Sequence, residues 1–101
     1  MERAEAAAND IKKESGSDLV EVLQLDLSSL KSVRKCAETL LEKEDKIDYL
    51  INNAGLAMTE LVLTEDGNET TFQANHLGHF LFTELILPLI KKSAASGFHP
   101  R

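Results

Sequence analysis

The fold is decided by the stretch Ile47–Gly55, which reads Ile-Asp-Tyr-Leu-Ile-Asn-Asn-Ala-Gly. Residues 47–51 are mostly apolar, so they are expected to form a short buried strand. The polar segment Asn52–Gly55 follows this strand directly. A strand of this composition needs cover on both faces, so its neighbours along the chain decide which architecture it belongs to.

A second apolar run lies upstream, at Leu19–Leu25, and is expected to form another buried strand. Ser28 or Ser29 then suits the N-cap position of a helix that runs to about Glu44. This helix carries one apolar stripe, formed by Leu30, Val33, Ala37, Leu40 and Leu41. Residues 19–51 are therefore predicted to form a strand, a helix and a strand, a right-handed unit with parallel strands.

Helical patterns flank this unit on both sides. Residues 1–15 have small and apolar side chains at helical spacing, and Gly16 follows at the position of a C-terminal cap. A long helix is predicted from about residue 69 to residue 92, and its second half is apolar nearly all round, which indicates cover on more than one side. Pro88 is expected to kink or loosen this helix. Residues 93–101 are expected to form a loop.

These elements predict an α/β fold in the order helix, strand, helix, strand, long helix. Two parallel strands bury a core only when further strands flank them and helices cover both faces. The chain supplies too few strands for that on its own. Residues 1–101 are therefore expected to be the central segment of a single doubly wound domain with a parallel sheet, incomplete at both ends.

Composition and charge exclude several classes of function. The chain has 101 residues, 17 acidic and 11 basic side chains, a net charge of −6 and a single cysteine, Cys36. The acidic balance argues against nucleic acid and anionic membranes as partners. One cysteine excludes an internal disulfide and a zinc site built from cysteines. The N-terminus is unlike a signal peptide, and no apolar run reaches the roughly 18 residues of a membrane span. An intracellular, cytoplasmic protein is expected, with membrane association of a longer chain left open.

Three segments resemble the short-chain dehydrogenase/reductase family. Asn52-Asn53-Ala54-Gly55 is similar to a motif that follows a buried strand in that family, and Asp26-Leu27 is similar to its acidic position beside adenine. The segment Asn75-His76-Leu77-Gly78-His79-Phe80 resembles the retinol-dehydrogenase-like branch. The resemblance covers essentially the whole chain and implies an NAD(P)-dependent oxidoreductase on a Rossmann-like sheet.

The resemblance also implies which residues bind the cofactor. Asp26 would accept a hydrogen bond from the adenine amine, and the Leu27 backbone would contact the ring. Asn53, Ala54 and Gly55 would line the cofactor at the carboxyl end of a strand. The cofactor would be NADP or NAD, with NADP favoured, and the substrate of the complete enzyme a small lipophilic alcohol or carbonyl compound.

Catalysis is implied less fully than cofactor binding. Asn75 matches the asparagine of the family's catalytic tetrad, which helps to hold the active-site lysine and a water chain that relays protons. Tyr49 is the only tyrosine, and Asn53 stands where the family's Tyr-x-x-x-Lys pattern would place the lysine. The family's glycine-rich phosphate turn is also missing, and its catalytic serine would lie beyond residue 101. The chain alone is therefore predicted to be inactive. Asn68 and Thr70 depart from this branch, which usually carries apolar residues there.

Several alternatives stand beside this interpretation. His76 and His79 could bind a metal, but helix packing and local hydrogen bonding are favoured, because no Glu-x-x-His pattern or cysteine cluster accompanies them. The alternative function is a non-catalytic short isoform that binds a full-length relative through helix 69–92, the helix through which a homo-oligomer is also expected. A truncated gene product without a function of its own is the third hypothesis.

Overall fold

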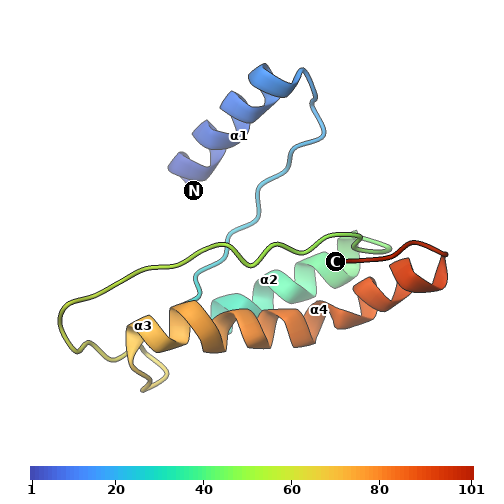
Figure 1. The fold of residues 1–101 in the computed structure, drawn as a ribbon. Helices are drawn as coiled ribbons and strands as arrows, with labels where there is room; N and C mark the ends of the chain where they lie inside the picture. Colours follow the sequence, from blue (N-terminus) through green and yellow to red (C-terminus); the bar gives the residue numbers. More distant parts are fainter.

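The computed structural model describes residues 1–101 as helices joined by non-helical segments (Figure 1). In chain order the helices are α1 (Glu2–Ser15), α2 (Leu30–Lys43), α3 (Thr70–Phe72), the π-helical turn η1 (Gln73–Leu77) and α4 (Gly78–Ala95). Because α3, η1 and α4 follow one another without a break, they form one long helix, which we call the rod. α2 packs along the rod, whereas α1 stands apart and contacts no other helix.

α1 is the helix expected for residues 1–15. Its first turn carries acidic side chains and its last turn basic ones, an arrangement that suits the helix dipole. Gly16 ends the helix with a φ of 70°, the left-handed conformation, and its N–H donates to the Lys12 carbonyl. The predicted helix and its glycine cap are therefore confirmed.

α2 is the helix predicted from the apolar stripe, and Ser29 is its N-cap. The Ser29 Oγ accepts a hydrogen bond from the Ser32 N–H at 3.3 Å. The core lies between α2 and the rod and consists of Leu27, Val33, Cys36, Ala37, Ala74, Phe82 and Ile86. Burial raises the pKa of the Cys36 thiol, so this side chain behaves as a small apolar group.

The two predicted strands, residues 19–25 and 47–51, are not formed in this chain. The structure contains no strand and one isolated antiparallel bridge, between Leu63 and Glu69. Part of the apolar surface of both segments is open to solvent, with Leu19 94% and Ile51 83% exposed, whereas Leu23, Ile47 and Leu50 are half-buried against the core. The prediction of two buried strands is therefore corrected by the structure.

The physical reason is the order of strands in a doubly wound sheet. By the resemblance, the two segments would be the third and fourth strands of the domain, and the second and first strands lie between these two in such a sheet. A strand is held by hydrogen bonds to the strands next to it. The two segments are not adjacent in such a sheet, so they do not pair with each other. Figure 1 shows one segment running from α1 to α2, and the other on the side of the rod that faces α1.

The end of the chain pairs with residues 47–51 and is not the free loop that was expected. The Arg101 N–H donates to the Asp48 carbonyl at 3.0 Å, and the Arg101 carbonyl accepts from the Leu50 N–H at 2.7 Å. Arg101 thus bonds to the residues on either side of Tyr49. This is the hydrogen-bond pattern of two parallel strands. The segment 47–51 therefore accepts a parallel partner on this side.

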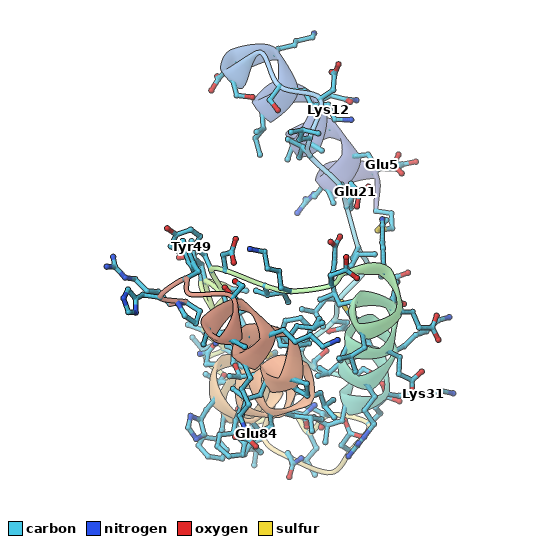
Figure 2. The ribbon with its side chains drawn as sticks, turned by 90° about the vertical axis from the view of Figure 1, so that its right-hand side faces the viewer. Glu5, Lys12, Glu21, Lys31, Tyr49 and Glu84 are labelled. Carbon is cyan, nitrogen blue, oxygen red and sulfur yellow. The ribbon has the colours of Figure 1, made fainter.

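Side chains hold the same region against the end of the rod. The Phe98 ring packs edge-on against Tyr49, with 5.4 Å between the ring centroids. The buried Ser93 hydroxyl donates to the Asp48 carboxylate. Figure 2 shows Tyr49 on the side of the helical layer that faces α1.

The rod runs to Ala95, slightly beyond the predicted end, and continues through Pro88. Pro88 has no N–H to donate to the Glu84 carbonyl. The rod also departs from α-helical bonding in η1, where the Gly78 N–H donates to the Gln73 carbonyl, five residues back. Turns of this kind occur often at functional sites, and η1 contains Asn75. No helix of the chain combines the length and the hydropathy that crossing a membrane requires.

Candidate functional site

The segment Asn52–Leu56 lies alongside the rod and is bound to it by polar contacts, which we call the polar seam. The contacts join Asn52 to Thr83, Ala54 to His79, and Leu56 to Asn75. Their donor–acceptor distances lie between 2.7 and 3.0 Å. The His79 Nε2 faces the Ala54 carbonyl, so this ring nitrogen carries the proton of the hydrogen bond.

The polar seam follows from the repeat lengths of an extended chain and a helix. Every second residue of Asn52–Leu56 meets every fourth residue of the rod, and the two segments run in opposite directions. Two residues of extended chain advance about 6.6 Å, and four residues of α-helix advance about 6 Å. The contacts therefore stay in register along the whole seam.

The side-chain amide of Asn75 makes two hydrogen bonds to the backbone of Leu56. Its Oδ1 accepts from the Leu56 N–H at 2.9 Å, and its Nδ2 donates to the Leu56 carbonyl at 2.7 Å. The side-chain amide thus replaces the backbone of a neighbouring strand. A Cβ placed at Gly55 would lie 3.4 Å from the Asn75 Oδ1, which is van der Waals contact.

A pocket of about 240 Å³ next to the polar seam collects most of the residues predicted to bind the cofactor. We call it the Asp26 pocket; it is lined by Leu25, Asp26, Leu27, Ser28, Ala54, Gly55, Leu56 and Ala74. It joins the turn before α2 to the segment that forms the seam. Asn53 does not line the pocket; it is exposed, and its side chain makes no hydrogen bond within the chain.

Asp26 has one free carboxylate oxygen in this pocket. Its Oδ1 accepts from the Ser28 N–H at 3.0 Å and from the Ser28 hydroxyl at 2.6 Å, which fixes the turn. Its Oδ2 makes no hydrogen bond within the chain. Asp26 thus fixes the turn before α2 with one carboxylate oxygen, whereas Ser29 caps the helix itself.

The residues of the Asp26 pocket have the chemistry that could hold a flat ring with an amine on its edge. Leucine and alanine side chains supply apolar walls for a flat ring, and the free Asp26 oxygen can accept from an amine on the edge of that ring. The phosphate-binding turn that is missing from the sequence has no replacement among the residues lining the pocket. The pocket residues therefore suit one half of the cofactor.

Gly78 lets the rod approach the Asp26 pocket closely. A Cβ at this position would lie 2.9 Å from the Leu27 carbonyl oxygen and 3.2 Å from the Gln73 carbonyl oxygen. Both are backbone atoms, which do not move aside as a flexible side chain would. Any larger residue here would push the rod away from the turn that carries Asp26.

Hydrogen bonding and packing occupy both histidines. His79 belongs to the polar seam. The ring centroid of His76 lies 5.4 Å from that of Phe72 and 6.5 Å from that of Phe80, so the rings form a row along the rod. The structure shows no cluster of side chains that could hold a metal ion.

Glu69 caps the start of the rod with its side chain. Its carboxylate oxygens accept from the Thr71 N–H and the Phe72 N–H, both at 2.9 Å. These hydrogen bonds stabilise the ionised form and hold the pKa of Glu69 below its ordinary value. Sequence reasoning placed the start of the helix correctly but did not identify the cap.

Gln73 is a fully buried polar residue that sequence reasoning missed. Its amide bonds to residues of the loop Thr64–Asn68 and to the Leu27 carbonyl. Asn68, one of the departures from the family pattern, is among these partners, and Thr70, the other, donates to the Val62 carbonyl. The only signal in the sequence is a polar residue at the start of an apolar helix, beside a loop rich in hydrogen-bonding side chains.

Comparison with known families gives one match that spans nearly the whole chain. Residues 1–97 match the family described as short chain dehydrogenase. Retinol dehydrogenase 13 from Homo sapiens is 50% identical over 96 residues, which are 95% of this chain and 29% of the relative. Retinol dehydrogenase 14 from Homo sapiens is 44% identical over 107 residues, which cover 93% of this chain and 32% of the relative. The chain thus spans about three tenths of the length of these curated relatives.

Solved structures share the path of the backbone. An alcohol dehydrogenase from the archaeon Thermococcus sibiricus, complexed with 5-hydroxy-NADP, matches 91% of this chain with a TM-score of 0.71 at 26% identity. The chain covers 40% of that protein. An NADPH-bound carbonyl reductase from chicken fatty liver matches 90% of this chain with a TM-score of 0.65 at 26% identity, over 38% of its own length. The segments without strand pairing therefore follow the course of larger dehydrogenase domains.

Proposed function

We propose, since this chain belongs to the short-chain dehydrogenase/reductase family, that residues 1–101 form the central segment of an NAD(P)-dependent oxidoreductase domain of the retinol-dehydrogenase-like branch. The complete domain would transfer a hydride between nicotinamide and a lipophilic alcohol or carbonyl substrate. Residues 19–25 and 47–51 would be strands of its doubly wound parallel sheet, paired with strands from outside this segment. Their exposed apolar side chains support this proposal.

The observation that carries the proposal is the Asp26 pocket, which joins two distant motifs around one apolar space. In the complete domain the Asp26 Oδ2 accepts from the adenine amine, the Leu27 backbone contacts the ring, and Ala54 and Gly55 line the cofactor. Asn53, outside the pocket, contacts the cofactor beyond the adenine. NADP is favoured over NAD, and the NADP-type ligands named for two similar structures support that choice.

Asn75 contributes to catalysis by positioning other groups. Its amide already holds both polar groups of the Leu56 backbone, and so fixes the end of the cofactor-binding segment. The second hydrogen of Nδ2 is left to bind the water chain of the family's tetrad. The nicotinamide supplies the hydride when the cofactor is bound, and the acid–base tyrosine and its lysine belong to the part of the domain outside these residues.

Nucleotide binding by the chain tests the role of the Asp26 pocket. The purified chain is titrated with 5′-AMP and followed by backbone amide NMR. The amides of Leu27, Ala54 and Gly55 are expected to shift, with a weak affinity of roughly 1 mM, because only the adenosine half is recognised. Asp26→Ala should weaken binding by about tenfold, the cost of a hydrogen bond to a charged group.

Asp45→Ala is the matched control, because this exposed carboxylate lies outside the pocket. It is expected to leave the affinity unchanged. Shifts that avoid the Asp26 pocket, or an equal loss of affinity in the two variants, would refute the proposal.

The chain by itself is proposed to be inactive. It contains no Tyr-x-x-x-Lys pattern, and the ring of Tyr49, its only tyrosine, packs against Phe98. Purified chain mixed with NADPH and a lipophilic aldehyde should oxidise NADPH no faster than buffer. Turnover that depends on both cofactor and chain would show that this proposal is wrong.

A non-catalytic short isoform that binds a full-length relative through residues 69–92 is the alternative. A row of aromatic rings on the rod favours it, because Phe72 is 53% and Phe80 61% exposed on either side of His76. The row has a phenylalanine on each side of His76, so it is symmetrical. Two copies of the row could therefore pack against each other across a two-fold axis. The same row would serve a homo-oligomer of the complete enzyme. The isoform requires a natural protein of 11.2 kDa.

A further inference from the structure

We propose that Gln73 is a positioning residue of the Asp26 pocket, an inference that rests on the function proposed for that pocket. Gln73 lies behind the pocket: it does not line it, but its neighbour Ala74 does. Its side chain is 0% exposed. A buried amide is tolerated only when its polar atoms are hydrogen-bonded, so its partners show what it holds in place.

All the hydrogen-bonding capacity of the Gln73 amide is used. Its Nε2 donates to the Leu27 carbonyl at 3.3 Å and to the Asp66 Oδ2 at 3.0 Å. Its Oε1 accepts from the Thr64 hydroxyl at 2.7 Å and from the Asn68 Nδ2 at 3.0 Å. Because Nε2 faces a carbonyl and a carboxylate, which only accept, these partners fix the orientation of the amide.

Asp66 extends this network to the start of α2. The Oδ2 that accepts from Gln73 also accepts from the N–H of Leu30, the first residue of α2, at 2.9 Å. Gln73 therefore links the loop Thr64–Asn68 to two points close to Asp26. One is the Leu27 carbonyl, inside the turn that begins at Asp26, and the other is the N–H of Leu30, just after that turn.

The Leu27 carbonyl is held from two directions. The Gln73 amide donates to it, and the backbone of Gly78 closes in so tightly that a Cβ there would lie 2.9 Å away. Asp26 is the residue directly before Leu27, so a displaced Leu27 carbonyl would carry the Asp26 carboxylate with it. Loss of the amide should thus weaken adenine binding although Gln73 makes no contact with the ring.

The test compares Gln73→Met with Thr70→Val. Methionine keeps the length of the buried side chain but removes its four hydrogen bonds. Thr70→Val removes a hydrogen bond at the same end of the rod, to the Val62 carbonyl, without reaching Leu27. Both variants and the unaltered chain are titrated with 5′-AMP by amide NMR, and the affinity is referred to the folded fraction. Gln73→Met should bind roughly tenfold more weakly, as expected when a supporting hydrogen-bond shell is lost, and Thr70→Val should bind unchanged.

Asn68→Ala is the milder second variant if Gln73→Met does not fold. It removes one bond to the Gln73 Oε1 and should lower the affinity in the same direction. Unchanged affinity in the Gln73 or Asn68 variant, with normal binding by the unaltered chain, overturns the positioning role alone. If the unaltered chain does not bind 5′-AMP, the function proposed for the pocket fails, and this inference fails with it. A role in folding alone predicts that Thr70→Val and Gln73→Met have equal affinity per folded molecule.

Discussion

At the scale of single residues, two side-chain amides of the rod bind backbone groups of the non-helical segments. Asn75 holds the N–H and the carbonyl of Leu56, and Gln73 holds the carbonyl of Leu27. Each amide offers donors and an acceptor within one rigid group, so it can bond to a backbone that has no other partner. The two residues lie on one turn of the rod, η1, whose altered hydrogen bonding sets their directions.

Acid should loosen the start of the rod through Glu69. The pKa of its carboxyl is lowered in the folded chain by the N–H groups of Thr71 and Phe72. A lowered folded-state pKa means that the cap stabilises the chain above the ordinary pKa of glutamate and that this stabilisation is lost as the pH falls through the folded value. The midpoint temperature of thermal unfolding should therefore decrease as the pH is lowered below about 5. The NMR signals of the Thr71 and Phe72 amides should shift over the same pH range.

Glu69→Gln is the control for this prediction. The amide can still accept hydrogen bonds but has no proton to gain, so the midpoint should lose this part of its pH dependence. An unchanged acid transition in Glu69→Gln would assign the effect to other carboxylates.

Most of the candidate site residues selected from the sequence lie close together in the structure, but their contacts could not be predicted. Asp26, Ala54, Gly55 and Asn75 were selected from motifs, and the structure brings the first three around one pocket and places Asn75 on the polar seam beside it. Gln73 was missed, because a side chain's partner depends on which distant segments the fold brings together. Local patterns carry no such information.

At the scale of elements, one packed layer coexists with segments that lack partners. α2 and the rod bury apolar stripes against each other. The helices were predictable because their periodicity and caps are local properties of the sequence. The strands were not formed, since a strand needs a neighbour that residues 19–25 and 47–51 do not offer each other. The π-helical turn had no local signal.

Gly78→Ala should reverse the usual effect of this substitution. In the interior of an ordinary helix, alanine in place of glycine stabilises by about 0.5–1 kcal/mol. Here the added Cβ would lie 2.9 Å from the Leu27 carbonyl oxygen, so the rod must shift, and we expect a loss of about 1–3 kcal/mol. Urea unfolding measures the difference.

Ala94→Gly, at an exposed position of α4, is the control, because it measures how glycine and alanine differ in helix stability without a change in packing. Because Ala94 lies in the last turn of α4, the substitution should cost at most about 1 kcal/mol, the value for a helix interior. A Gly78→Ala chain as stable as the unaltered one would show that the close approach of the rod to Leu27 is absent in solution.

At the scale of the whole molecule, the chain is more extended than a domain of its length. Its radius of gyration is 15.2 Å, whereas a compact domain of similar length has about 13 Å. The cause is visible in Figure 1, where α1 stands away from the layer formed by α2 and the rod. In the complete domain that we propose, strands from outside this segment would lie between these parts and cover the exposed apolar residues of both extended segments.

The mass of the natural protein tests most directly whether these residues are the central segment of a larger domain. The protein is captured from its source with an antibody against residues 1–15, and its intact mass is measured. A species well above 11.2 kDa is predicted, because the chain spans only 29% of retinol dehydrogenase 13. A natural species of 11.2 kDa would contradict the central claim and favour the short isoform that binds through its exposed aromatic row.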